Sequence, residues 1–177
     1  TIPIRNDGIS TRIFYDLKTA LAEKPDYAQC WKNLGDAYRD MGDIPSAQNC
    51  YEKSLELDPN LFEALLSYAT LLIRHKDNPG EALNYLNKIS LTSLSSNQSG
   101  TVYGWQAAAY LKLGCYAEGI AKAKDAIVMY PDAEWTWSIA GRLYALARGD
   151  NTQWIEPSVD FWNRFIEKYP QSCEAWA

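Results

Sequence analysis

Residues that commonly build catalytic or metal sites are scarce in this sequence of 177 residues. His75 is the only histidine, so no pair of histidine ligands can form. Four cysteines, Cys30, Cys50, Cys115 and Cys173, lack the CxxC spacing of structural zinc sites. The chain also has no GxGxxG sequence and no phosphate-binding loop. We therefore expect a protein that is not an enzyme and needs no metal or other cofactor.

Basic residues are also fewer than acidic ones. The chain has 17 basic and 22 acidic residues, which gives a net charge of −5. Nucleic acid is an unlikely partner for such a chain, since binding to phosphates requires a basic face. No run approaches the roughly 20 apolar residues of a membrane span, and the sequence does not start with a signal segment. We expect a soluble chain in the cytoplasm or another reducing compartment, with its cysteines as buried free thiols. Acidic pairs such as Glu52 and Glu56 are expected to be solvated on an outer helix face.

Hydrophobic residues, in contrast, make up 47% of the chain and aromatic residues 13%, which is ample for a core. Residues 28–61 are predicted to form a helical hairpin. Its first half carries four residues at the spacing of one helix face, Trp31, Leu34, Gly35 and Tyr38. A turn is predicted at Gly42-Asp43.

The second half of this stretch repeats the pattern with another apolar stripe, Ala47, Tyr51, Leu55 and Leu57. Pro59 ends the second helix, because proline disfavours helix in the residue before it. Since Gly35 and Ala47 are small, we expect the two backbones to approach closely there, with Trp31 and Tyr51 at the wider ends.

The run Trp31-Lys32-Asn33-Leu34-Gly35-Asp36-Ala37-Tyr38, followed by Ala47, Tyr51 and Pro59, resembles the tetratricopeptide repeat, which has a period of about 34 residues. The resemblance implies an all-α fold, a right-handed superhelical solenoid of antiparallel helix pairs. In this family the first helices of the repeats line a concave surface, and peptide ligands lie there.

The same frame can be followed along the chain and divides it into six segments. We expect a lead-in and a lone helix from Ser10 or Thr11 to Lys24, either a cap or the second helix of an incomplete repeat. The predicted segments are 1–27 for this lead-in and helix, 28–61 for repeat 1, 62–99 for repeat 2, 100–133 for repeat 3, 134–172 for repeat 4 and 173–177, with Trp176, for the start of a truncated repeat.

Repeat 2 has a one-residue slip in a turn at 76–80 and a long loop at 92–100. Repeat 4 has a lengthened turn near 148–152. A repeat cut short in this way suggests a piece of a longer protein.

The resemblance also places candidate peptide-binding residues on the first helices, at the family's ligand-facing positions. These are Lys32, Asn33, Asp36, Arg39, Leu66, Thr70, Ile73, Trp105, Ala108, Lys112, Trp135 and Arg142. Trp105 and Trp135 are the strongest candidates, since neither occupies the packing position of Trp31 and aromatic residues are frequent binding anchors. The alternative is that both pack against a neighbouring helix. Gly119 and Ala123 would allow a close helix approach or leave room for Trp105.

One subclass of the family binds the C-terminal carboxylate of chaperone tails through lysine and asparagine side chains. Lys32 fits that pattern, but Asp36, Ser67, Thr101 and Trp105 do not, and Asp36 would repel a carboxylate. Basic residues at Arg39, Arg74, Lys112 and Arg142 form either a track for an acidic peptide or a solvated face.

We therefore predict a non-catalytic protein-interaction scaffold that binds a peptide segment of a partner other than a chaperone tail, within a larger chain or a multiprotein complex. Two alternatives stay open: a structural or oligomerising arm, and the substrate-selecting arm of a larger enzyme.

Overall fold

The computed structural model describes residues 8–148 and 155–170, and it contains helices but no strand within those ranges. The predicted all-α class is thereby confirmed. The chain divides into two compact units, Thr1–Ile89 and Ser90–Ala177. Three predicted features lie outside the described residues: the lead-in at 1–7, the lengthened turn at 149–152, and the truncated repeat with Cys173 and Trp176.

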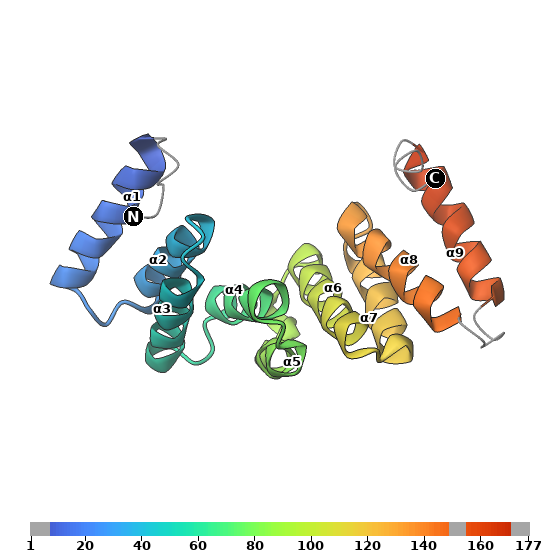
Figure 1. Ribbon diagram of the computed structural model, residues 1–177, viewed down its shortest axis with the longest axis horizontal. Coiled ribbons are helices and arrows are strands. Elements are labelled where there is room, and N and C mark those ends of the chain that lie inside the picture. Colours follow the sequence, from blue (N-terminus) through green and yellow to red (C-terminus); the bar gives the residue numbers. More distant parts are fainter. Residues whose placement is uncertain (1–7, 149–154, 171–177) are drawn as a thin grey trace. The chain divides into compact units, whose positions relative to one another are not determined.

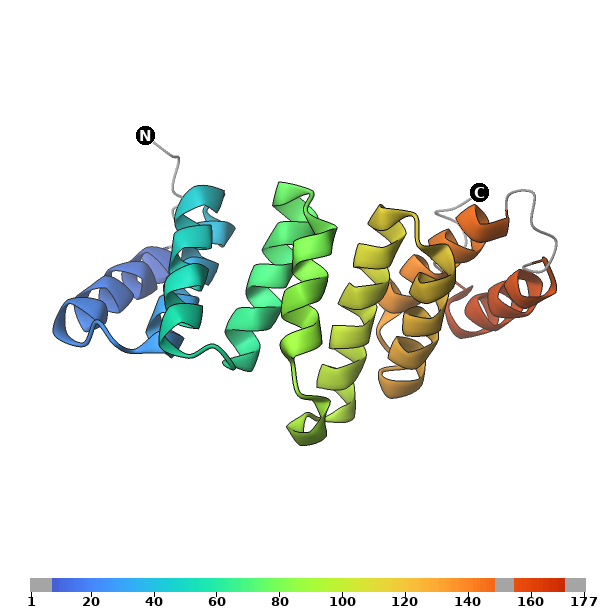
Figure 2. The same cartoon turned by 90° about the horizontal axis from the view of Figure 1, so that it is seen from below.

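The first unit consists of short helices joined by tight turns (Figure 1). Its elements are α1 (Gly8–Glu23), α2 (Ala28–Asp40), α3 (Ile44–Leu57), α4 (Phe62–Leu71), the π-helical turn η1 (Leu72–Lys76) and α5 (Pro79–Lys88). Figure 2 shows α2 beside α3 and α4 beside α5, each pair forming a hairpin. This unit therefore contains the helix pairs that the periodicity predicted.

The turn at Gly42-Asp43 is confirmed in detail. Gly42 has a φ of +82°, a left-handed conformation that glycine adopts without strain. The Asp43 carboxylate accepts a hydrogen bond from the Ser46 backbone N–H and so caps α3. Asn78 caps α5 in the same manner, with Pro79 in its first turn.

The turn predicted at 76–80 is confirmed only at Asp77 and Asn78, because the first helix of that pair continues through η1 to Lys76 and α5 already begins at Pro79. A π-helical turn accommodates one extra residue per turn, so the one-residue slip is taken up inside the helix. Asp77 then reverses the chain with a φ of 50°. Residue spacing alone does not distinguish a π-helical turn inside the helix from a longer turn after it.

The second unit contains longer helices. Its elements are η2, a 3-10 turn (Leu91–Ser93), α6 (Ser96–Leu113), α7 (Tyr116–Met129), α8 (Glu134–Arg148) and α9 (Ile155–Lys168). Gly114 ends α6 with a φ of +74°, as Gly42 does after α2. A glycine in the same left-handed conformation therefore follows the first helix in both of these pairs.

The loop predicted over 92–100 is wrong beyond Ser95, because α6 already begins at Ser96. Ser95 and Gln98 form a capping box: the Ser95 hydroxyl accepts from the Gln98 backbone N–H, and the Gln98 side chain accepts from the Ser95 N–H. The polar composition suggested a loop, but its serine and glutamine satisfy the free N–H groups of a helix start.

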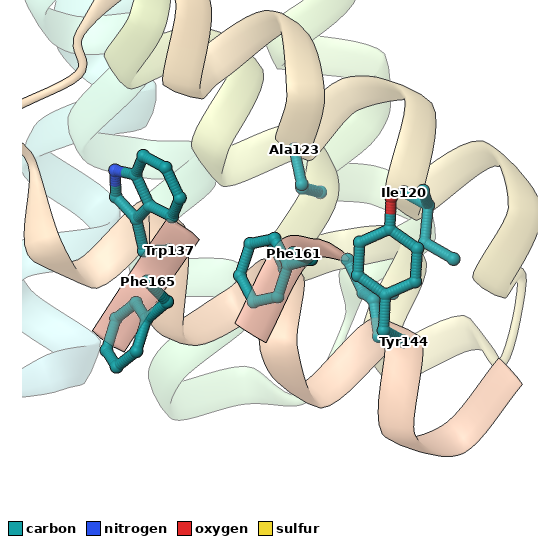
Figure 3. Packing of buried hydrophobic residues seen from close by; sticks show 9 residues of the cluster. Ile120, Ala123, Trp137, Tyr144, Phe161 and Phe165 are labelled. Atoms are coloured by element: carbon teal, nitrogen blue, oxygen red, sulfur yellow. The ribbon is translucent and has the colours of Figure 1, made fainter. Parts of the chain in front are cut away.

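The core of the second unit combines aromatic rings with alanine, isoleucine and leucine side chains (Figure 3). Trp137 is 5% exposed and lies 5.6 Å from Phe161 and 6.3 Å from Phe165, measured between ring centroids. The Trp137 indole N–H donates to the Pro131 carbonyl at 3.0 Å. Trp31 in the first unit makes the same bond to Pro25 at 2.8 Å. The two tryptophans are thus structural counterparts.

The close approach of α2 and α3 differs from the prediction in its partner. A Cβ atom at Gly35 would lie 2.7 Å from Cε1 of Tyr51, so the glycine makes room for the Tyr51 ring rather than mainly for Ala47. Gly119 likewise leaves room for Leu143 and not for Trp105. A Cβ atom added at Gly119 would lie 2.6 Å from Cδ2 of Leu143. Each glycine accommodates one large side chain of a neighbouring helix.

Two smaller expectations also need correction. Leu57 does not belong to the buried stripe of α3, because it is the last residue of that helix and is 37% exposed. Cys30 and Cys50 are buried free thiols as predicted, whereas Cys115 is free but only half-buried.

Candidate functional site

The candidate residues on α2 form a connected polar surface centred on Asp36. The Asp36 carboxylate accepts an ion pair from Lys32 at 2.9 Å and from Arg39 at 3.0 Å. Arg39 also pairs with Asp40 at 3.0 Å, and the Lys32 ammonium donates to the Asn33 side chain at 3.4 Å. The two cations and two carboxylates balance, so this surface has little net charge to offer a ligand.

A buried tyrosine holds Asp36 in place from the second helix of the same pair. The Tyr51 hydroxyl donates to Asp36 Oδ1 at 2.6 Å, and the Tyr51 side chain is fully buried. Burial, and then the hydrogen bond to Asp36, raises the pKa of Tyr51 well above its usual range. Tyr51 therefore stays a neutral donor and orients the carboxylate that organises Lys32 and Arg39.

Glu52 is part of a second such network and is not a simple solvated residue as the sequence suggested. Its Oε1 accepts from the Tyr68 hydroxyl at 2.7 Å and from the Gln48 amide at 2.8 Å. Desolvation, followed by this bond, raises the pKa of Tyr68 above its usual range. The carboxylate belongs to the packing between α3 and α4.

The candidates on the second helix pair of the first unit vary in exposure. Leu66 and Thr70 on α4 are half-buried and contribute some surface. Ile73, in η1, is 3% exposed and presents almost nothing to a ligand. Tertiary packing, which the repeat position does not reveal, accounts for this difference.

In the second unit, the two candidate tryptophans lie against each other. The ring centroids of Trp105 on α6 and Trp135 on α8 are 5.3 Å apart, with 35° between the ring planes. Both side chains are half-buried. A Cβ atom at Gly104 would lie 2.8 Å from Cζ3 of Trp135, so the absent side chain at 104 makes space for this indole. Each tryptophan is therefore partly packed and partly accessible, so packing against a neighbouring helix and contact with a ligand do not exclude each other.

Three further candidates accompany this tryptophan pair on the same two helices. Lys112 on α6 and Arg142 on α8 are exposed, whereas Ala108 is 9% exposed. The accessible part of the predicted surface in this unit therefore consists of two indole rings and two cations.

The sequence did not single out a groove between α7, α8 and α9. It has a volume of about 360 Å³ and is lined by aromatic residues with Lys124, Asp160 and Arg164 at the edge. A counterpart of about 490 Å³ lies between α1, α2 and α3. The repeat register could have found both, because one constant interval separates Lys18 from Lys124 and Trp31 from Trp137.

Within residues 8–148 and 155–170, no three side chains of the metal-binding types cluster. No described helix combines the length and the apolar character that crossing a bilayer would take.

Comparison with known proteins identifies the repeats. Two family models described as tetratricopeptide repeat match residues 28–61 and 50–84. Superkiller protein 3 of Schizosaccharomyces pombe is 27% identical over 132 residues, which cover 72% of this chain. The matched region is 9% of the length of that relative, so the chain corresponds to a small part of it.

Solved structures with this fold include two with low sequence identity. MamA from Desulfovibrio magneticus RS-1, residues 41 to the end, has a TM-score of 0.76 at 19% identity, with 93% of each chain covered. YrrB has a TM-score of 0.73 at 18% identity, covering 93% of this chain and 80% of its own. Proteins with this fold are typically non-catalytic scaffolds. The solved structures show a shared fold, and the repeat matches show that the chain belongs to the tetratricopeptide repeat family.

Proposed function

We propose that this chain is a protein-interaction scaffold whose second unit binds a peptide segment of a partner at the paired indoles of Trp105 and Trp135. The tetratricopeptide repeat fold supports the general role of a scaffold. The observation that carries the finer proposal is the pairing of two half-buried tryptophans from the first helices α6 and α8. Partly accessible aromatic side chains that are already held in place lose little entropy when they bind a ligand.

The surroundings of the pair suit a peptide. Lys112 and Arg142 are exposed on the same helices and can contact carbonyl or carboxylate groups next to an apolar anchor. YrrB, which shares the fold, is described as having an unusual peptide-binding site. We propose the polar surface of Lys32, Asn33, Asp36 and Arg39, with Leu66 and Thr70, as a second contact region within the first unit.

A chaperone tail is not the proposed ligand. Lys32, the one residue that fits the carboxylate-binding pattern, is already paired with Asp36 at 2.9 Å. A terminal carboxylate would have to compete with Asp36 for this ammonium and would be repelled by it. Tight binding of a peptide ending in Glu-Glu-Val-Asp would contradict this part of the proposal.

The test uses peptides selected from a random display library on the wild-type chain. We expect Trp105→Ala and Trp135→Ala each to weaken binding of a selected peptide by about 2 kcal/mol or more, as truncation of an interface hot spot does. Fluorescence anisotropy with labelled peptide measures the affinity, and circular dichroism checks that each variant keeps its helices.

A matched control is Tyr15→Ala, which removes another exposed aromatic ring, from α1 in the first unit. We expect this variant to bind the selected peptides as the wild type does. If the tryptophan variants remain folded and bind with unchanged affinity, the proposed site is wrong.

A further inference from the structure

The groove between α7, α8 and α9 has a charged edge that differs from that of its counterparts. Its floor is formed by Trp137, Tyr144 and Phe161, and Val128 stands beside it with 77% of its surface exposed. Lys124 from α7 and Arg164 from α9 are exposed at its edge. In the described ranges 8–148 and 155–170, neither cation forms an ion pair, although Asp160 lies one helical turn before Arg164.

The matching groove between α1, α2 and α3 engages its own cations. Lys18, the counterpart of Lys124, lies 4.7 Å from the ring centroid of Phe14 and 5.7 Å from that of Tyr38. Lys53, the counterpart of Arg164, pairs with Glu56 at 2.8 Å. Lys18 is the basic residue among those that line this groove, and aromatic rings of the same unit engage it; Lys53 lies outside the lining and is paired with Glu56.

A third groove, between α3, α4 and α5, has an acidic residue at the position where the other two grooves have a lysine. Glu52 takes the place of Lys18, and Glu56 also lines this groove, with Lys88 on its other side. The three grooves thus share one position in the repeat but differ in charge. Only in the groove between α7, α8 and α9, among these three, do cations stand without an ion-pair or ring partner in the described structure.

We propose that the groove between α7, α8 and α9 is a further docking site, separate from the indole site, for a short acidic segment of a partner protein with an apolar side chain between carboxylates. The apolar side chain would lie over Phe161 and beside Val128, and the carboxylates would pair with Lys124 and Arg164. Charge complementarity at the edge selects an acidic occupant over a basic one. The net charge of −5 on the whole chain makes this attraction local.

The probe is a fluorescein-labelled peptide in which leucines are flanked by aspartates, compared with a peptide in which lysines replace the aspartates. We expect the acidic peptide to bind and the basic one not to bind. The double variant Lys124→Glu with Arg164→Glu should weaken binding about tenfold, because two attractions between exposed charges are replaced by two repulsions. Both side chains are exposed, so we expect the variant to fold, and circular dichroism checks this.

The matched control is Lys18→Glu with Lys53→Glu, which makes the same charge change at the counterpart positions of the first unit. We expect this control to alter the affinity less than twofold at the same ionic strength. An equal effect of both double variants, binding of the basic peptide, or no measurable binding of the acidic peptide would each overturn the proposal. Trp105→Ala should leave this binding unchanged, so failure here is distinguishable from failure of the indole site.

Discussion

Helices α1, α2 and α3 of the first unit and helices α7, α8 and α9 of the second use the same repeat frame with different side chains. Trp31 and Trp137 donate equivalent hydrogen bonds to proline carbonyls. Trp31 is nevertheless half-buried, whereas Trp137 is buried. This difference in burial arises at one pair of equivalent positions. In α9 the residue is Phe161, whose ring packs against Trp137, whereas in α3 it is the smaller Cys50.

A second pair of positions shows how each second helix is held on the first. In α3, the Ser54 hydroxyl donates to the Ala28 carbonyl at 2.8 Å. In α9, the corresponding Phe165 instead lies 6.3 Å from the Trp137 ring. One contact is a directional hydrogen bond and the other is non-directional burial of apolar area. A tetratricopeptide frame therefore specifies where helices meet, while the chemistry of the contact can change from one pair to another.

The largest expected effect comes from giving the second unit the side chain of the first. Phe161→Cys removes a ring that contacts Trp137, Tyr144 and Phe165, and we expect a loss of about 3 kcal/mol in the free energy of unfolding. Urea denaturation followed by circular dichroism measures the loss.

The reverse change, Cys50→Phe, adds a ring at a position that is 5% exposed but borders the groove of about 490 Å³, and we expect it to cost at most about 1–3 kcal/mol by overpacking. If Phe161→Cys were neutral, aromatic packing would not explain how α9 is held.

An intermediate effect should appear at alkaline pH and should depend on the first unit alone. Burial raises the pKa of the Cys50 thiol from 9.0 to about 11. The folded-state pKa is above the unfolded value, so the contribution to stability is complete below pH 9 and is lost as pH rises through 11. We expect a loss on the order of 2 kcal/mol from this thiol.

Cys50→Ala provides the control, because it removes the titrating group while the neighbouring tyrosines stay. Urea denaturation of both proteins between pH 8 and pH 11 gives the difference between them. Parallel pH profiles for wild type and variant would show that Cys50 does not titrate as inferred.

The smallest expected effect compares two glycines that face aromatic rings. In Gly35→Ala, the new Cβ would lie 2.7 Å from Cε1 of the fully buried Tyr51, and we expect a net cost of about 1 kcal/mol after the better helix propensity of alanine. In Gly141→Ala, the contact is to Cη2 of Trp162, which is half-buried and can move. We expect that change to be close to neutral, measured by thermal denaturation, and equal costs would contradict the role assigned to ring mobility.

Much of the fold could be predicted because the repeat depends on local rules. Trp31, Leu34, Gly35 and Tyr38 define a helix face, Gly42 defines a turn, and Pro59 defines an end. The errors occurred where one local rule competed with another. Ser95 and Gln98 were read as loop residues although they cap α6, and the extra residue before Asp77 was assigned to a turn although η1 absorbs it.

The candidate sites were less predictable, since repeat position does not report exposure. Ile73 and Lys112 were placed on the same predicted surface, yet Ile73 is buried and Lys112 is exposed. The contact between Trp105 and Trp135 depends on Gly104 beneath one of the rings, a relation between helices that are distant in sequence.

By itself, the sequence determined most of the helix pairs and the turn at Gly42-Asp43, because helix periodicity and the conformations of glycine and proline act over a few neighbouring residues; its resemblance to a known repeat indicated the family. Only the tertiary structure decided which side chains share a space, as Gly35 does with Tyr51 and Trp105 does with Trp135. It also decided which cations have partners, since ion pairs and packing depend on distances in space that residue spacing along the chain does not determine.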